Sequence, residues 1–118
     1  MISNSLQTNI LASTASDRSI ILYDSRGSTP LRKLIMSMRG NTVAWNPVEA
    51  FTFTVANEDS NLYTFDMRRF DQPVNVHMDH VSAVLDIDYS PTGQEFVSGS
   101  FDKTIRIYPS NGGHSRYV

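Results

Sequence analysis

Cysteine is absent from the 118 residues of this chain. Its absence excludes disulfide bonds, thiolate metal sites and cysteine nucleophiles. Long apolar runs are also missing, because runs such as residues 20–23 have strand length and fall far below the roughly 20 residues of a membrane helix. The ten basic and twelve acidic residues are spread without blocks, so no basic surface for nucleic acid or membrane is indicated. We expect a soluble, intracellular protein without membrane contacts, which meets RNA only through partner proteins.

One unit occurs three times in the sequence. Residues 9–26, 51–68 and 94–111 align without gaps. The copies share an aspartate and, six positions later, an aromatic residue, which are Asp17 and Tyr23, Asp59 and Phe65, and Asp102 and Tyr108. A period of about 40–45 residues is typical of stacked repeats.

Each copy has the chemistry of a β-hairpin with the aspartate in its turn, where a carboxylate can accept backbone N–H bonds that the bend leaves unpaired. The hairpin strands are predicted at residues 11–14, 51–56 and 96–99 before the turn, and from Ile20, Leu62 and Ile105 after it. Further strands are predicted at residues 31–35, 42–45, 74–77 and 84–89. Prolines end two of these strands, because proline cannot donate to a strand ladder.

Four short strands per unit and no helical periodicity predict an all-β fold, and the period selects a β-propeller with four-stranded blades. We predict one partial propeller over residues 1–118, with units at about 1–26, 30–68 and 73–109 and a tail at 110–118. The first unit contains only its last two predicted strands. The chain is therefore expected to hold about two and a half to three blades and to begin inside a blade.

Residues 80–108 resemble a WD repeat. His80 holds the place of the histidine in the Gly-His pair of such repeats, and Ser98, Asp102 and Tyr108 follow at the expected offsets. In WD repeats these four positions form a buried hydrogen-bond network within one blade, so the resemblance implies such a network here. Two positions depart from the pattern, because Asp79 replaces the usual glycine and Tyr108 the usual tryptophan.

The middle copy departs further from this pattern. Met36 stands where the histidine is expected and Val55 where the serine is expected. Asp59 is therefore expected to lack its usual partners. We expect the middle sheet to rely on apolar packing.

Two groups of polar residues have alternative interpretations. Ser98, His80 and Asp102 have the composition of a catalytic triad, which is recognised by geometry and not by chain order. The structural network explains them as well, because a buried polar group without a partner costs roughly 1–3 kcal/mol. His77, Asp79 and His80 could form a metal site, but alternation along a strand places the two histidines on opposite faces. We predict a non-enzymatic protein without cofactor, metal or small-molecule substrate.

Two segments follow a further WD-repeat signature, in which an aspartate and an arginine close the third strand of a blade. They are Tyr23-Asp24-Ser25-Arg26 and Phe65-Asp66-Met67-Arg68. In WD-repeat substrate receptors of cullin-4 ubiquitin ligases, the arginine helps to dock the ligase adaptor, as bidentate pairing would allow. Asp24, Arg26, Asp66 and Arg68 are therefore candidate docking residues. The alternative is that the arginines are exposed residues flanking a blade.

Nearly the whole chain resembles the Sof-type family, named for suppressor of fibrillarin, whose animal members are also called cullin-4-associated factors. The resemblance rests on Trp45-Asn46-Pro47, Ala56-Asn57-Glu58-Asp59, Phe65-Asp66-Met67-Arg68 and His77-Met78-Asp79-His80. It implies a nucleolar, nuclear scaffold of the small-subunit processome that serves pre-18S rRNA processing through protein partners. Contacts with pre-rRNA and small nucleolar RNA are expected to be indirect. The alternative is a substrate receptor of a cullin-4 ligase.

Overall fold

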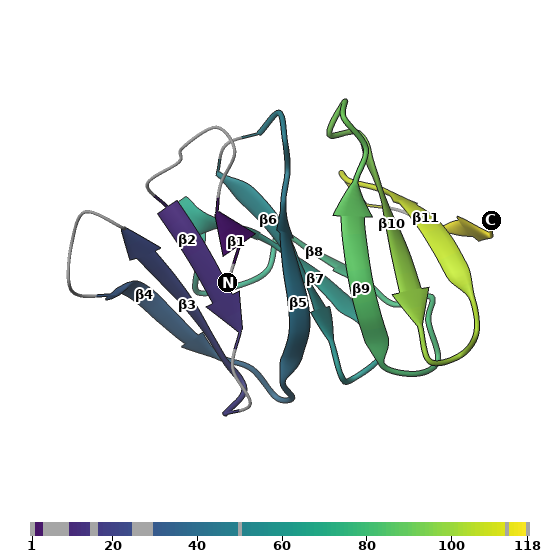
Figure 1. Ribbon diagram of the computed structural model, residues 1–118, viewed down its shortest axis with the longest axis horizontal. Helices are drawn as coiled ribbons and strands as arrows, with labels where there is room; N and C mark the ends of the chain where they lie inside the picture. Colours follow the sequence, from purple (N-terminus) through teal and green to yellow (C-terminus); the bar gives the residue numbers. More distant parts are fainter. Residues whose placement is uncertain are drawn as a thin grey trace.

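A computed structural model describes residues 2–3, 10–14, 17–24, 30–49, 51–112 and 114–117. They form three four-stranded antiparallel sheets in which strands pair in chain order (Figure 1). The first sheet contains β1 (Ile2–Ser3), β2 (Ile10–Thr14), β3 (Ser19–Asp24) and β4 (Pro30–Ile35). The second contains β5 (Gly40–Trp45), β6 (Thr52–Asn57), β7 (Leu62–Asp66) and β8 (Asn75–His77). The third contains β9 (Val84–Tyr89), β10 (Glu95–Ser100), β11 (Ile105–Pro109) and β12 (Arg116–Tyr117).

The all-β propeller blades predicted from the repeat are confirmed. Each predicted hairpin strand has its counterpart in the structure, and the described residues contain no α-helix, only the short 3-10 helix η1 (Met67–Arg69) after β7. Nor does the described part of the chain hold a helix with the length and apolarity needed to cross a membrane.

The first and third sheets each gain a short strand that was not predicted. β1 pairs with β2 through Ile2 and Ser3, so the first sheet has a strand at the position where none was expected. β12 pairs with β11 in the third sheet. Because β4 and β8 belong to the sheets before them, a predicted sequence unit is offset from a structural sheet by one strand.

The three sheets stand side by side like blades, with their first strands nearest to one another (Figure 1). β5 lies beside β9 on one side and beside β2 and β1 on the other. Asn41 on β5 also donates a 2.8 Å hydrogen bond from Nδ2 to the carbonyl of Val84 at the start of β9. The second sheet is therefore covered on both faces.

One face of the second sheet packs against the first sheet through apolar side chains. Phe53 stacks on Phe65 with ring centres 5.6 Å apart, and Trp45 lies 5.0 Å from Phe53. These rings meet Ile20 and Leu22 of β3 in one buried cluster. Aromatic and β-branched residues favour such a half-buried pleated surface, which explains why the strands form here.

The other face of the second sheet packs against the third sheet. Ala56 and Leu62 meet Val84 and Phe96 in a second buried cluster. Phe96 stacks on Tyr108 at 5.3 Å, in the same cross-strand position that Phe53 and Phe65 hold in the second sheet. This face also contains buried polar side chains, which belong to the site described next.

Candidate functional site

The three hairpin turns share one geometry around their aspartates. The Oδ1 atoms of Asp17, Asp59 and Asp102 accept the backbone N–H two residues later, at 3.1, 3.0 and 2.9 Å. The residue between has a left-handed backbone with φ from 66° to 75° in all three turns. The carboxylate stabilises this bend because it pairs an N–H that the strands cannot reach.

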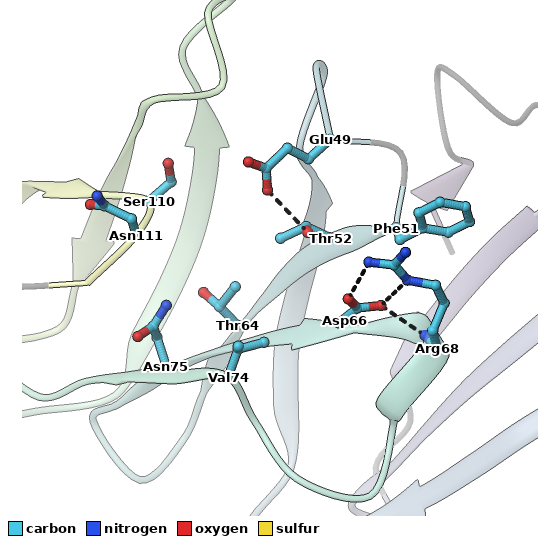
Figure 2. A pocket seen from close by; sticks show the side chains of 10 residues that line it. All are labelled: Glu49, Phe51, Thr52, Thr64, Asp66, Arg68, Val74, Asn75, Ser110 and Asn111. Carbon is cyan, nitrogen blue, oxygen red and sulfur yellow. Dashed lines mark hydrogen bonds and ion pairs between the residues drawn. The ribbon is translucent and has the colours of Figure 1, made fainter.

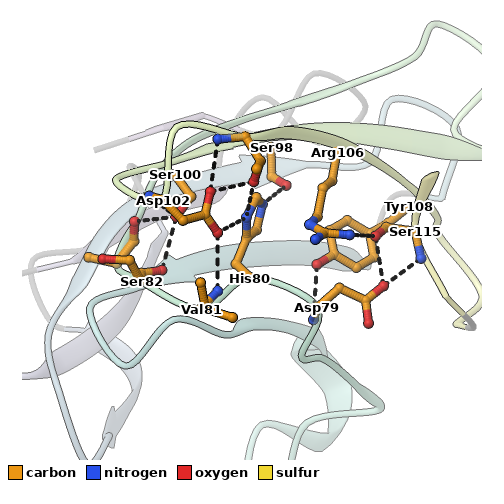
Figure 3. A network of polar contacts seen from close by, with 12 residues as sticks. Asp79, His80, Val81, Ser82, Ser98, Ser100, Asp102, Arg106, Tyr108 and Ser115 are labelled. Carbon is orange, nitrogen blue, oxygen red and sulfur yellow. Dashed lines mark hydrogen bonds and ion pairs between the residues drawn. The ribbon is translucent and has the colours of Figure 1, made fainter. Parts of the chain in front are cut away.

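In the third sheet, three of the four predicted network residues come together (Figure 3). His80, in the connection between β8 and β9, places Nε2 2.7 Å from Ser98 Oγ on β10. Its Nδ1 lies 3.0 Å from Oδ2 of Asp102 in the β10–β11 turn. An ionised carboxylate only accepts hydrogen bonds, so Nδ1 donates to Asp102, and in the neutral ring Nε2 accepts from the serine hydroxyl.

The same carboxylate holds two further groups that the sequence pattern did not include. Asp102 Oδ2 accepts the backbone N–H of Val81 at 3.1 Å, and Oδ1 accepts the hydroxyl of Thr104. Burial by itself would raise the pKa of Asp102, but the hydrogen bonds from Thr104, Val81 and His80 outweigh it and hold this pKa well below its usual range. Asp102 therefore clamps the β8–β9 connection to the turn as an anion.

The order Ser98, His80 and Asp102 also matches the hydrogen-bond sequence of a catalytic triad. Ser98 is only 1% exposed and His80 only 3% exposed. A nucleophile must reach the reacting atom of its substrate, and a hydroxyl covered to this extent cannot. The geometry therefore favours the structural role of these three residues over the hydrolytic one.

The fourth network residue, Tyr108, is buried beside His80 but bonds elsewhere. Its ring centre lies 6.2 Å from that of His80, and its hydroxyl accepts the backbone N–H of Asp79 at 3.3 Å. Burial raises the pKa of Tyr108, and the nearby carboxylate of Asp79 raises it further. The two departures from the WD pattern, Asp79 and Tyr108, thus contact each other.

Asp79, in the connection between β8 and β9, binds the segment that precedes β12. Its Oδ2 accepts the backbone N–H of Ser115 at 2.6 Å and the Ser115 hydroxyl at 2.7 Å, just before β12. Burial by itself would raise the pKa of Asp79, but the bonds from Ser115 and His114 prevail and lower it to about 2. An aspartate in place of glycine therefore anchors β12.

His77, the next candidate metal ligand, faces the junction between the second and third sheets. Its Nε2 lies 2.9 Å from the hydroxyl of Thr64, which is 2.8 Å from the hydroxyl of Thr54. Thr54 in turn lies 2.5 Å from the Tyr89 hydroxyl on β9. Burial lowers the pKa of His77 to about 4, although Asp79 opposes the shift, so the ring is neutral near pH 7.

The possible metal cluster is not assembled. His77 turns to Thr64, His80 to Ser98 and Asp102, and Asp79 to Ser115. Within the described residues, no group of three histidines or carboxylates is placed to hold a metal ion.

The expectation that the second sheet relies on apolar packing needs correction. The chain of Thr54, Thr64 and His77 joins its three outer strands on the face toward the third sheet. At its turn, Asp59 accepts the hydroxyl of Tyr63, a residue four positions later on β7. Asp59 therefore finds a partner within its own hairpin, where Asp102 uses a histidine from another connection.

Of the four candidate docking residues, Asp66 and Arg68 form an ion pair with two side-chain hydrogen bonds (Figure 2). Arg68 donates from Nε to Asp66 Oδ1 at 3.0 Å and from Nη2 to Oδ2 at 2.7 Å. Its guanidinium carbon also lies 4.3 Å from the centre of the Phe51 ring. Both contacts hold the exposed side chain of Arg68, within η1, in one orientation. Asp24 ends β3, and Arg26 lies outside the described residues.

Comparison with known proteins gives the same fold. Residues 71–109 match the family described as "WD domain, G-beta repeat". The chain is also similar to a chain of the solved structure "Crystal Structure of Mitotic Checkpoint Complex", with a TM-score of 0.83 and 16% identity. That similarity covers 92% of this chain and 33% of the other. At this identity it shows the propeller fold alone.

The sequence has much nearer relatives. "DDB1- and CUL4-associated factor 13" of Danio rerio is 69% identical over 115 residues, which are 98% of this chain and 26% of that protein. The Homo sapiens protein of the same name is 67% identical over the same shares. "Protein SOF1" of Saccharomyces cerevisiae is 56% identical over 98% of this chain and 24% of that protein. The chain thus spans about a quarter of the length of these curated relatives, and the Sof-type resemblance is confirmed.

Proposed function

We propose that this chain, a WD-repeat homologue of Protein SOF1 and of DDB1- and CUL4-associated factor 13, serves as a non-catalytic scaffold in the biogenesis of the small ribosomal subunit. The similarity to a Sof-type protein over 98% of the chain carries this proposal. The buried, mutually satisfied polar network supports it, because such a network makes the blades rigid without exposing a reactive group. We place the protein in the nucleolus, among protein partners of the small-subunit processome.

The scaffold proposal is tested by purifying the natural, full-length protein through an affinity tag from nucleoli of its source organism. We expect small-subunit processome proteins, and pre-rRNA and small nucleolar RNA with them. After nuclease treatment the proteins should stay bound, since the RNA contacts are indirect. A preparation that lacks processome proteins would contradict the proposal, and labelling of Ser98 by a fluorophosphonate serine probe would contradict the non-catalytic role.

A second candidate function is docking of a cullin-4 ligase adaptor. The names of the relatives link them to DDB1 and CUL4, and the fixed orientation of Arg68 supports this role here. Asp66 occupies one edge of the guanidinium, and an arginine held in this way loses little side-chain entropy when a partner carbonyl or carboxylate binds.

Charge reversal separates this function from the exposed-arginine alternative. Arg26→Glu combined with Arg68→Glu should weaken binding of purified DDB1 to the full-length protein by at least about tenfold. Arg39→Glu is the matched control, because Arg39 is an exposed arginine paired with Glu58 at the β6–β7 turn, away from η1. Unchanged DDB1 affinity in the double variant would rule out docking through these arginines.

A further inference from the structure

A trough runs between the second and third sheets on the side of the β5–β6 and β7–β8 connections. Its middle hollow, of about 490 Å³, is the one drawn in Figure 2. At Arg68 this hollow shares a wall with a second one of about 620 Å³ beside the β7–β8 connection. At Glu49 it shares a wall with a third of about 480 Å³ beside the β9–β10 turn. The second and third hollows share no lining residue with each other, so the three follow one another in a row, here called the blade-junction trough.

At the third hollow, the floor of the blade-junction trough rests on Asn46, which is 1% exposed and contacts residues of the lining. Asn46 Nδ2 donates to the carbonyl of Gly93 at 3.0 Å, and its Oδ1 accepts the backbone N–H groups of Val48 and Glu49 at 2.9 and 3.1 Å. The hydroxyl of Ser110 donates to the same Gly93 carbonyl at 2.7 Å. The second and third sheets are therefore already joined at this point in the free protein. Binding of a partner then costs little entropy for the ordering of loops.

Gly93 shows how closely the two sheets meet at this floor. Its φ is +71°, a left-handed conformation that favours glycine, and a Cβ at this position would overlap Asn46 Oδ1. The Asn46-Pro47 sequence at the end of β5 and the glycine of the β9–β10 turn thus form one joint. The trough is complete within the two sheets that the chain itself supplies.

The lining of the blade-junction trough is mixed, because hydrogen-bonding side chains lie beside the apolar Phe51 and Val74. Amide side chains come from Asn75 and Asn111, and hydroxyls come from Thr52 and Ser110 (Figure 2). Amides and hydroxyls both donate and accept, so they match the alternating N–H and C=O groups of an extended polypeptide. Compact small molecules favour an enclosed, mostly apolar pocket instead. The elongated shape and the hydrogen-bonding side chains therefore point to a polymer with main-chain amides.

The charges select the kind of polypeptide. Arg68 is neutralised by Asp66 within the trough wall. Glu49 lies in the β5–β6 connection of the same sheet, where its carboxylate accepts one long hydrogen bond, of 3.3 Å, from the Thr52 hydroxyl. Within the described part of the chain no cation pairs with Glu49, and Figure 2 shows its carboxylate turned toward the hollow in front of Ser110 and Asn111. The free acceptor is suited to a lysine or arginine.

A phosphate polymer fits the blade-junction trough less well. The trough contains three carboxylates, of Glu49, Asp66 and Asp71, and two guanidinium groups, of Arg68 and Arg69. Their sum is one negative charge (two minus three), whereas binding to nucleic acid depends on net neutralisation of phosphates. Charge therefore favours a basic polypeptide over RNA.

We infer that the blade-junction trough binds an extended, basic polypeptide segment of a partner protein. A lysine or arginine of the segment pairs with Glu49, and its main chain is hydrogen-bonded by Asn75 and Asn111. The inference rests on the proposed scaffold function in one respect, since it identifies a surface by which the scaffold takes a protein partner.

The test uses random twelve-residue peptides displayed on phage and selected on the full-length protein. Enriched peptides should carry a lysine or arginine at one recurrent position. As synthetic peptides in fluorescence anisotropy they should bind Glu49→Lys at least about tenfold more weakly than the unchanged protein. Glu58→Lys is the matched control, because it makes the same charge change at the β6–β7 turn and should keep full affinity. Circular dichroism melting verifies that both variants are folded.

Other outcomes would overturn the inference. These are no enriched peptide, enriched peptides without a basic preference, or equal affinity for Glu49→Lys. Binding of an oligouridine probe that Arg69→Glu weakens would assign the trough to RNA instead. The purification test of the scaffold proposal does not depend on this result, so a processome association together with a failed peptide selection would leave the scaffold function and move its contacts to another surface.

Discussion

In the third sheet the turn aspartate Asp102 is tied to His80 from the preceding connection, whereas in the second sheet the equivalent Asp59 is tied to Tyr63 on its own hairpin. In both turns the residue directly after the aspartate has a left-handed backbone conformation. The geometry of the aspartate turn is therefore independent of the side chain that makes the second contact with the carboxylate. The turn geometry shapes the hairpin. The second contact joins the hairpin to another segment in the third sheet, through His80, but not in the second sheet, where Tyr63 belongs to the same hairpin.

The two sheets also differ in the faces that the described residues cover. The second sheet lies between two others and buries apolar side chains on one face and a mixed surface on the other. Among the described residues, the second sheet covers one face of the third sheet, and Leu85, Val97 and Ile105 are exposed.

The largest expected difference between the two sheets is in the free energy of unfolding after each turn aspartate is replaced by alanine. Asp102→Ala leaves the His80 Nδ1–H and the N–H groups of Val81 and Thr104 without their acceptor, so we expect the free energy of unfolding to fall by about 3 kcal/mol. Asp59→Ala should lower it by about 1 kcal/mol, because the groups of Asn61 and Tyr63 are half-buried and can turn to water.

Urea unfolding of the full-length protein, followed by circular dichroism, measures both values. Asp102→Asn is the control for side-chain size, since its amide oxygen still accepts one of the N–H groups. Equal losses for Asp59→Ala and Asp102→Ala would show that the turn alone matters and that the fastening by His80 adds nothing.

The junction between the two sheets should respond to acid through His77. Its folded-state pKa of about 4 lies below its ordinary value of 6.5 because the ring is buried, so between these pH values the unfolded chain binds a proton that the folded chain does not. Stability is full above pH 6.5 and falls as the pH drops to 4, by as much as about 3 kcal/mol. The groups that face the ring are Asp79, Tyr108 and, through Thr64, Tyr89.

His77→Gln distinguishes this contribution from that of the carboxylates. The amide keeps a partner for Thr64 but does not titrate, so the stability curve of the variant should be flatter than that of the unchanged protein between pH 6.5 and 4. Asp79 and Asp102 have lowered pKa values, so their contributions are present at pH 4 and are lost only below it. An unchanged slope in His77→Gln would place the acid sensitivity elsewhere.

How far the sequence predicts these features depends on whether their residues lie within one repeat. The positions of His80, Ser98 and Asp102 follow from the resemblance to a WD repeat, and the structure brings them together. The chain from His77 to Tyr89 was missed, because Thr54, Thr64, His77 and Tyr89 come from four strands and meet only when two sheets pack. β1 and β12 have two residues each, too few to show an alternating pattern.

A small effect is expected at a position where the two sheets differ by a single oxygen atom. Phe65 of the second sheet and Tyr108 of the third sheet hold equivalent cross-strand positions, so Tyr108→Phe converts one into the other. It removes the acceptor of the Asp79 N–H and should lower the free energy of unfolding by about 1 kcal/mol. The loss should appear as a lower urea midpoint with an unchanged slope of the transition.

The reverse change, Phe65→Tyr, tests whether the hydroxyl needs a prepared partner. Phe65 is fully buried among Phe53 and Phe70, so a hydroxyl there has no polar neighbour within that aromatic cluster and should destabilise by about 1–3 kcal/mol. If Phe65→Tyr were neutral while Tyr108→Phe was destabilising, the second sheet would contain an acceptor that its aromatic packing does not suggest. If both were neutral, the contact between Asp79 and Tyr108 would be a consequence of packing and not a contribution to stability.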